Sequence, residues 1–305
     1  MTKKKYYFMS GLPRSGSTLL STLLNQNPEI YSGPSSPVLG VMVGAHDNFL
    51  TNELYLGYPK PDQANDVIGS IIENFYSDIK KPIIIDKNRA WTGRMPFIEG
   101  YIQPEELKVI VPVRRVDEIL TSFLTMVHRN PFKEGQAKIN YIDEVLIKSD
   151  TPMNDENRCM HLLNSGGILY DSLHTLKLGV EDGYRECFHY VDYNDMMMDP
   201  QGEMDKIYEF LGEKSFEHSF EGLVNQNREK DLEVYGLADM HEVHSVLKKT
   251  SPPPSTILPE SILEIYEQNR LQLEFWTEPL VPKIQPKKYG PPETKAISYN
   301  LFSNK

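Results

Sequence analysis

The chain has 305 residues, of which 39% are hydrophobic and 25% charged, and its formal net charge is −11. This composition is typical of a globular protein, and the length suits one large α/β domain. The acidic balance argues against DNA or RNA as the main partner, because nucleic-acid-binding proteins usually present a basic face.

The cysteine content and the hydropathy pattern bear on location. Two cysteines, Cys159 and Cys187, make no disulfide framework in a chain this long, so we read both as free thiols in a reducing compartment. No apolar run approaches the roughly 18 residues of a membrane span. The basic start at residues 3–5 precedes too short an apolar run for a signal peptide. We therefore expect a cytoplasmic protein without a membrane span.

The first third of the chain predicts one strand, a glycine-containing loop and several helices. The apolar residues 6–9 indicate a strand, and the spacing of leucines over residues 18–25 indicates a helix. Residues 31–37 are too rich in Pro and Ser for regular structure. Helical patterns follow at residues 38–56 and 67–79.

The rest of the chain continues the alternation. We expect strands at residues 82–87, 107–113 and 187–191, the last followed by a loop through Asp199. We expect helices at residues 117–129, 158–179, 202–211 (ended by Gly212) and 259–276. Alternating strands and helices predict a three-layer α/β/α fold with a central, mostly parallel sheet. The Pro- and Lys-rich residues 278–305 read as an extended tail on a domain of residues 1–277.

Residues 11–18, GLPRSGST, have the spacing of a phosphate-binding P-loop. Gly11 and Gly16 allow a tight backbone path, and the following helix offers free N–H groups and the positive end of its dipole. The hydroxyls of Ser15, Ser17 and Thr18 add hydrogen-bond donors, and Arg14 adds a forked cation. Ser17 stands where a nucleotide triphosphatase carries its Lys, which favours a phosphate-bearing donor other than ATP.

The Pro13–Thr18 stretch resembles the P-loop of the sulfotransferase family, whose donor is 3′-phosphoadenosine 5′-phosphosulfate (PAPS). That family also has a strand ending in Arg with a Ser eight residues later, and Arg114 and Ser122 match this pair. The resemblance implies that Arg114 and Ser122 hold the 3′-phosphate. The Tyr-Asn-Asp segment that begins at Tyr193 is similar to a family segment near the nucleotide, which implies the same place for Tyr193.

The same resemblance implies a reaction and its site. A sulfonyl group would pass from PAPS to a hydroxyl or amine, leaving 3′-phosphoadenosine 5′-phosphate (PAP), with no metal. Arg14 and Lys87 would lie at the transferring group. The proton acceptor is less plain, because Arg89 stands where one branch has His, and residues 33–36 lack the Glu of another. We take His46 as the candidate base, a His being suited to that role near neutral pH.

Several alternatives stay open. Asp86 and Glu53 are lesser candidates for the base, and Asp86 would be the Mg²⁺ ligand if the chain were a P-loop kinase or nucleotide triphosphatase. A non-catalytic nucleotide-binding relative is a third reading. His241 and His244 lack the spacing of a helical metal pair, so we expect no zinc. Residues 239–249 read as a segment crossing the nucleotide site, where Lys248 and Lys249 either reach the 3′-phosphate or are solvated. The acceptor (small molecule, carbohydrate or peptide) and a homo-oligomeric state are not decided by the sequence.

Overall fold

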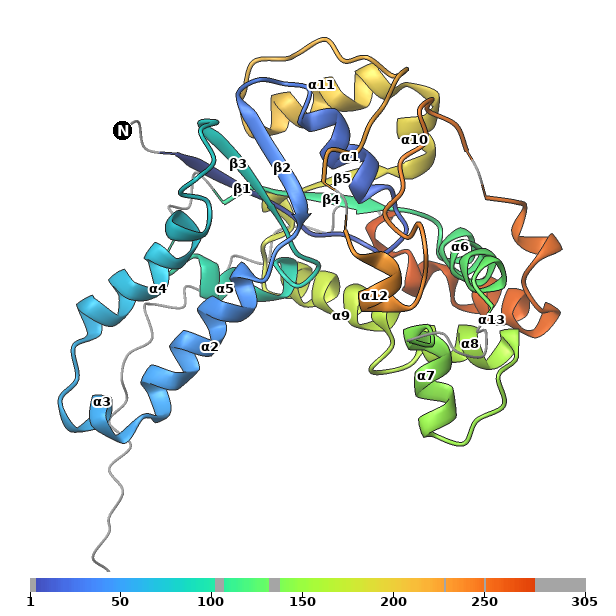
Figure 1. Cartoon of the computed structure of the whole chain (residues 1–305), viewed down its shortest axis with the longest axis horizontal. Coiled ribbons are helices and arrows are strands. Elements are labelled where there is room, and N and C mark those ends of the chain that lie inside the picture. The colour runs from blue at the N-terminus through green and yellow to red at the C-terminus, as the bar shows by residue number, and fades with distance from the viewer. Residues whose placement is uncertain (1–3, 102–106, 132–137, 228, 250, 278–305) are drawn as a thin grey trace, which may run out of the picture.

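The computed structural model describes residues 4–101, 107–131, 138–227, 229–249 and 251–277 (Figure 1). Its centre is a five-stranded sheet in the order β2-β3-β1-β4-β5, in which every neighbouring pair is parallel. The strands are β1 Lys5–Met9, β2 Ile30–Ser35, β3 Ile83–Lys87, β4 Val109–Val113 and β5 Phe188–Asp192. The predicted α/β fold with a parallel central sheet is confirmed.

Helices cover both faces of this sheet. On one face lie α1 (Ser17–Leu24), α10 (Tyr193–Met198) and α11 (Pro200–Leu211) (Figure 1). The other face packs against a larger group of helices. The remaining bounds are α2 Val38–Thr51, α3 Glu53–Gly57, α4 Pro61–Phe75, α5 Met95–Ile98, α6 Val116–Arg129, α7 Tyr141–Lys148, α8 Asp155–Leu163, α9 Ile168–Glu181, α12 Asp231–Tyr235 and α13 Glu260–Leu273.

Two hydrophobic cores follow from this layering. Along β1, Tyr6 and Phe8 enter the core under the larger helix group, whereas Tyr7 and Met9 enter the core under α1 and α11. Successive side chains of a strand point to opposite faces, so a strand buried on both sides reads as a continuous apolar run. Cys159 is fully buried in the first core, and both cysteines are free thiols.

Residues 31–37 do not form the irregular loop that we predicted. Ile30–Ser35 is strand β2, which pairs only with β3 and therefore forms an edge of the sheet. An edge strand tolerates Pro34 because one side of it needs no ladder donor. The pairing with β3 is irregular between Ser32 and Ser35.

Two further predictions of secondary structure are also wrong. The single helix expected over residues 158–179 is divided into α8 and α9, and Gly166 at the break has a φ of 85°. The loop expected through Asp199 contains helix α10, whose first turn is capped by the Asp192 carboxylate. The predicted end of α11 at Gly212 is confirmed, with Gly212 in the left-handed region at φ 72°.

Membrane insertion finds no support in the helices that the structure describes. Within the described ranges, none is both long and apolar enough to cross a bilayer. The tail expected at residues 278–305 lies outside these ranges.

Candidate active site

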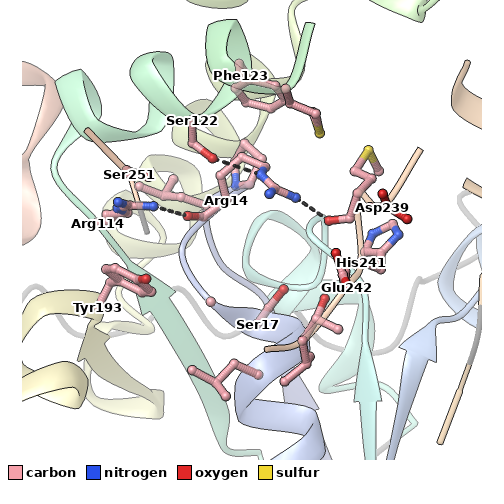
Figure 2. A pocket seen from close by; sticks show the side chains of 18 of the residues that line it. Arg14, Ser17, Arg114, Ser122, Phe123, Tyr193, Asp239, His241, Glu242 and Ser251 are labelled. Carbon is pink, nitrogen blue, oxygen red and sulfur yellow. Dashed lines mark hydrogen bonds between the residues drawn. The ribbon is translucent and has the colours of Figure 1, made fainter. Parts of the chain in front are cut away.

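A pocket of about 300 Å³ opens beyond the carboxyl ends of β1, β3 and β4. Its walls come from the glycine loop, the residues after β3, helix α6 and a late segment at residues 238–249 and 251 (Figure 2). In parallel α/β sheets this edge is where ligands bind. We call residues 238–249 and 251 the late segment; the stretch 239–249 is the one expected from the sequence to cross a nucleotide site, and Asp239–His244 line the pocket.

The glycine loop connects β1 to the N-terminus of α1. A Cβ on Gly11 would lie 2.2 Å from the carbonyl oxygen of Pro112, so only glycine lets the loop pass this close to β4. Gly16 has a φ of 88° and precedes α1, and no side chain caps this helix. The first-turn N–H groups of α1 have no intrahelical partner. The loop therefore presents backbone donors and the positive end of a helix dipole to an anion, and Ser17 and Thr18 line the same pocket.

Arg14 occupies the centre of the loop in an uncommon conformation. Its φ is 60°, which is rare for a residue with a Cβ. Its Nε donates to Ser122 Oγ at 3.2 Å, and Nη1 donates to the carbonyl oxygen of Met240 in the late segment (Figure 2). Burial lowers the pKa of Arg14. The structure thus brings Arg14 and Ser122 together, and it holds the loop cation under the late segment.

Arg114 is a buried cation, and one of its hydrogen-bond donors has no partner among the described residues. Its side chain is 3% exposed, its Nε donates to Glu118 at 2.9 Å, and its Nη1 donates to the carbonyl oxygen of Arg14 at 3.1 Å. The guanidinium lies 4.1 Å from the ring centroid of Tyr193. Its Nη2 is buried and bonds no group of the described residues. Buried donors are seldom left unpaired, so Nη2 marks a place for an acceptor.

The late segment adds another cation on the Arg114 side. Lys249 Nζ donates to Glu118 at 2.7 Å and to Asn194 Oδ1 at 2.9 Å, and Lys248 lines the pocket. Glu118 is thus shared between Arg114 and Lys249 and cannot neutralise both. This part of the pocket keeps a positive charge.

Lys87 lies at the end of β3 and lines the pocket with a side chain that is almost wholly buried. Burial lowers its pKa to about 8, although the charge of Glu229 opposes that shift. Arg89 and Arg129 also line the pocket. A chain of net charge −11 therefore gathers cations around one cavity, which suits a multiply charged anion.

The proposed base His46 does not reach this pocket. It lies on α2, packs its ring edge-on against Phe97 at a centroid distance of 5.4 Å, and pairs with Asp47 at 3.2 Å. It is not among the residues that line the pocket, and Glu53, exposed at the start of α3, is not either. Without contact to the pocket, neither residue meets the first requirement of a general base.

Asp86 is likewise withdrawn from the pocket. It is fully buried, and its carboxylate accepts hydrogen bonds from Ser36, Tyr76 and Trp91. Burial raises the pKa of Asp86. Both of its carboxylate oxygens accept hydrogen bonds within the core. The geometry therefore disfavours Asp86 as a Mg²⁺ ligand and as the base.

The structure contains a cluster of Glu229, Asp231 and His241 that we did not predict from the sequence. His241 Nδ1 lies 2.7 Å from Glu229 Oε2 and 2.6 Å from Asp231 Oδ1. The backbone N–H of His241 donates to Asp231 Oδ2 at 2.8 Å. These distances are those of hydrogen bonds, whereas ligands about 2.0–2.2 Å from a metal would stand further apart. No motif links residues 229, 231 and 241, so only the fold reveals the cluster.

Comparison with known proteins identifies the family. A model of the sulfotransferase family matches residues 7–218, and the chain belongs to this family. The protein-tyrosine sulfotransferase A of Caenorhabditis elegans is 24% identical over 211 residues, which are 68% of this chain and 49% of that protein. The chain thus spans about half the length of this curated relative.

Solved structures give weaker likenesses. The sulfotransferase domain of the Synechococcus PCC 7002 olefin synthase is 18% identical, with a TM-score of 0.48 over 92% of this chain and 98% of that chain. Mouse sulfotransferase SULT7A1, solved in complex with PAP, is 13% identical, with a TM-score of 0.47 over 88% and 84% of the two chains.

Proposed function

We propose that this sulfotransferase-family chain takes PAPS as its donor and transfers the sulfonyl group to a hydroxyl or amine. The proposal rests on the buried Nη2 of Arg114, which lies beside Tyr193 and has no hydrogen-bond partner among the described residues. Arg114 lines the same pocket as the uncapped N-terminus of α1. One pocket with two separate anion sites suits a nucleotide that carries phosphate at both ends of its ribose.

The two anion sites have different tasks in this proposal. The glycine loop and α1 hold the 5′-phosphosulfate, while Arg114 and Ser122 hold the 3′-phosphate and the Tyr193 ring packs beside it. As the sulfur–oxygen bond breaks, charge builds on the oxygen that bridges to the 5′-phosphate. Lys87 and the loop N–H groups are fixed donors for that charge, which is how preorganised sites lower such barriers.

A direct test compares nucleotides by thermal unfolding. PAP at about 100-fold above its Kd is expected to stabilise the folded chain by about 2.7 kcal/mol. ATP with Mg²⁺ is expected to stabilise it far less, because Ser17 replaces the P-loop Lys and Asp86 is committed to the core. Stabilisation by ATP–Mg²⁺ and not by PAP would refute the proposed donor and favour a kinase or triphosphatase.

A further inference from the structure

The proposed reaction needs a proton acceptor, and the positions where the family resemblance places one lack it. Arg89 stands in one of these positions, and residues 33–36, at the end of β2, carry no acid in the other. Glu229 lies at this end of β2, although it is distant from β2 in the sequence. Its carboxylate accepts a hydrogen bond from the backbone of Ser35 and interacts electrostatically with Lys87. The late segment places His241 against Glu229.

His241 is held on one side only. Its Nδ1 faces Glu229 and Asp231, its backbone N–H donates to Asp231, and its carbonyl accepts from Asn225. The Tyr235 ring packs edge-on at 5.9 Å. The two carboxylates and the aromatic neighbour fix the orientation of the imidazole, and the two backbone hydrogen bonds hold the chain at His241.

The two carboxylates decide which ring nitrogen carries the proton. An ionised carboxylate only accepts hydrogen bonds, so Nδ1 must be the donor and Nε2 holds the lone pair of the neutral ring. No hydrogen bond to Nε2 is formed by the described residues. His241 lines the pocket of the candidate active site, whereas Glu229 and Asp231 are not among the residues that line it. Figure 2 shows His241 in the late segment that Arg14 contacts.

We propose that Nε2 of His241 accepts the proton of the acceptor group during sulfonyl transfer, with Asp231 as the positioning residue. The inference rests on the proposed function. The acceptor oxygen forms a bond to sulfur, and the bond between sulfur and the bridging oxygen breaks. The electron pair of the broken bond stays on the 5′-phosphate of PAP, and the acceptor proton moves to Nε2. Asp231 and Glu229 then balance the charge of the imidazolium, as a carboxylate does in a Ser-His-Asp triad.

Glu229 is less suited than His241 to accept this proton. Burial raises the pKa of Glu229, but the hydrogen bond from His241 and the charge of Lys87 outweigh it and hold the pKa below its ordinary value. A carboxylate that is strongly stabilised as an anion is a weak base.

The decisive variant is His241→Ala, assayed with PAPS and a series of phenols of increasing acidity. For phenol itself we expect kcat to fall by about 10²–10⁴-fold, the usual contribution of a general base. The loss should shrink steadily towards p-nitrophenol, which needs little help in losing its proton. PAP should stabilise the variant as it does the parent chain. A merely structural His would give the same loss for every phenol.

His128→Ala is the matched control. His128 pairs with Asp155 at 3.0 Å on the exposed side of α6. The variant therefore loses a comparable His–carboxylate contact outside the pocket. Its kcat is expected to equal that of the parent chain. Asp231→Asn is expected to lower kcat and to leave the KM for PAPS unchanged, because the imidazolium loses a partner and the donor site does not.

The inference fails, with the proposed function intact, if His241→Ala transfers at the parent rate, or if transfer is lost on chelation and recovers on adding Zn²⁺. Nitrogen-15 NMR of labelled histidine tests the tautomer without any acceptor. It is expected to show His241 protonated at Nδ1, and protonation of the neutral ring at Nε2 would refute the assignment. Failure of PAP to stabilise the parent chain would instead sink the proposed function.

Discussion

Arg114→Ala is expected to weaken the binding of PAP by at least about 30-fold. Removing one partner of a buried, charge-assisted contact costs about 2–5 kcal/mol, and each 1.4 kcal/mol is a factor of ten in Kd. Arg114 is 3% exposed and its Nη2 has no partner among the described residues, so the full contact is available to the 3′-phosphate. Isothermal titration with PAP measures the change.

Arg115→Ala serves as the matched control for Arg114→Ala. Arg115 is the next residue, it also pairs with an acid, Asp117 at 2.6 Å, and it does not line the pocket. Both variants lose an ion pair, but only Arg114→Ala should lose affinity for PAP. Adenosine 5′-monophosphate lacks the 3′-phosphate, so the parent chain and Arg114→Ala should bind it alike. An equal loss for both nucleotides would contradict the assignment.

The part of the pocket to which we assign the donor was predictable because its parts are local in sequence. The glycine loop lies between a strand and the helix that follows it, and Arg114 and Ser122 lie on one strand–helix unit. A strand followed by a helix fixes the direction of both elements and brings residues eight apart to one face. Only Tyr193 is distant, and it follows β5, the neighbour of β4 in the sheet.

The acceptor side was not predictable because its contacts join irregular segments far apart in sequence. Glu229, Asp231 and His241 lie around the short helix α12, where neither helical nor strand periodicity identifies a face. His46 was chosen for its chemistry, but α2 extends away from the end of the sheet towards α3 (Figure 1). The edge strand β2 was hidden by Pro34, which local propensity penalises and an edge position permits.

Lys87→Met is expected to lower kcat by about 10²–10³-fold while leaving the Kd of PAP within a few-fold of the parent value. Removing one fixed donor to a developing charge costs this much in comparable sites. Lys87 lines the pocket at the end of β3. It does not belong to the strand–helix unit that carries Arg114 and Ser122, which are proposed to hold the 3′-phosphate. Lys177→Met on α9, which removes a lysine 60% exposed outside the pocket, should retain both kcat and Kd.

The pH dependence gives the Lys87 prediction a second readout. Burial places the pKa of Lys87 at about 8, below its ordinary value, so the free chain loses this cation as the pH rises through about 8. We therefore expect kcat/KM for PAPS to fall on the alkaline side, and this limb to be absent in Lys87→Met. The unfolded chain binds the proton up to a higher pH than the folded chain. From about pH 8 up to the ordinary lysine pKa, Lys87 therefore makes folding more favourable as the pH rises. Loss of activity at high pH with rising resistance to unfolding would separate this titration from alkaline denaturation, whereas an alkaline limb that persists in Lys87→Met would assign it to another group.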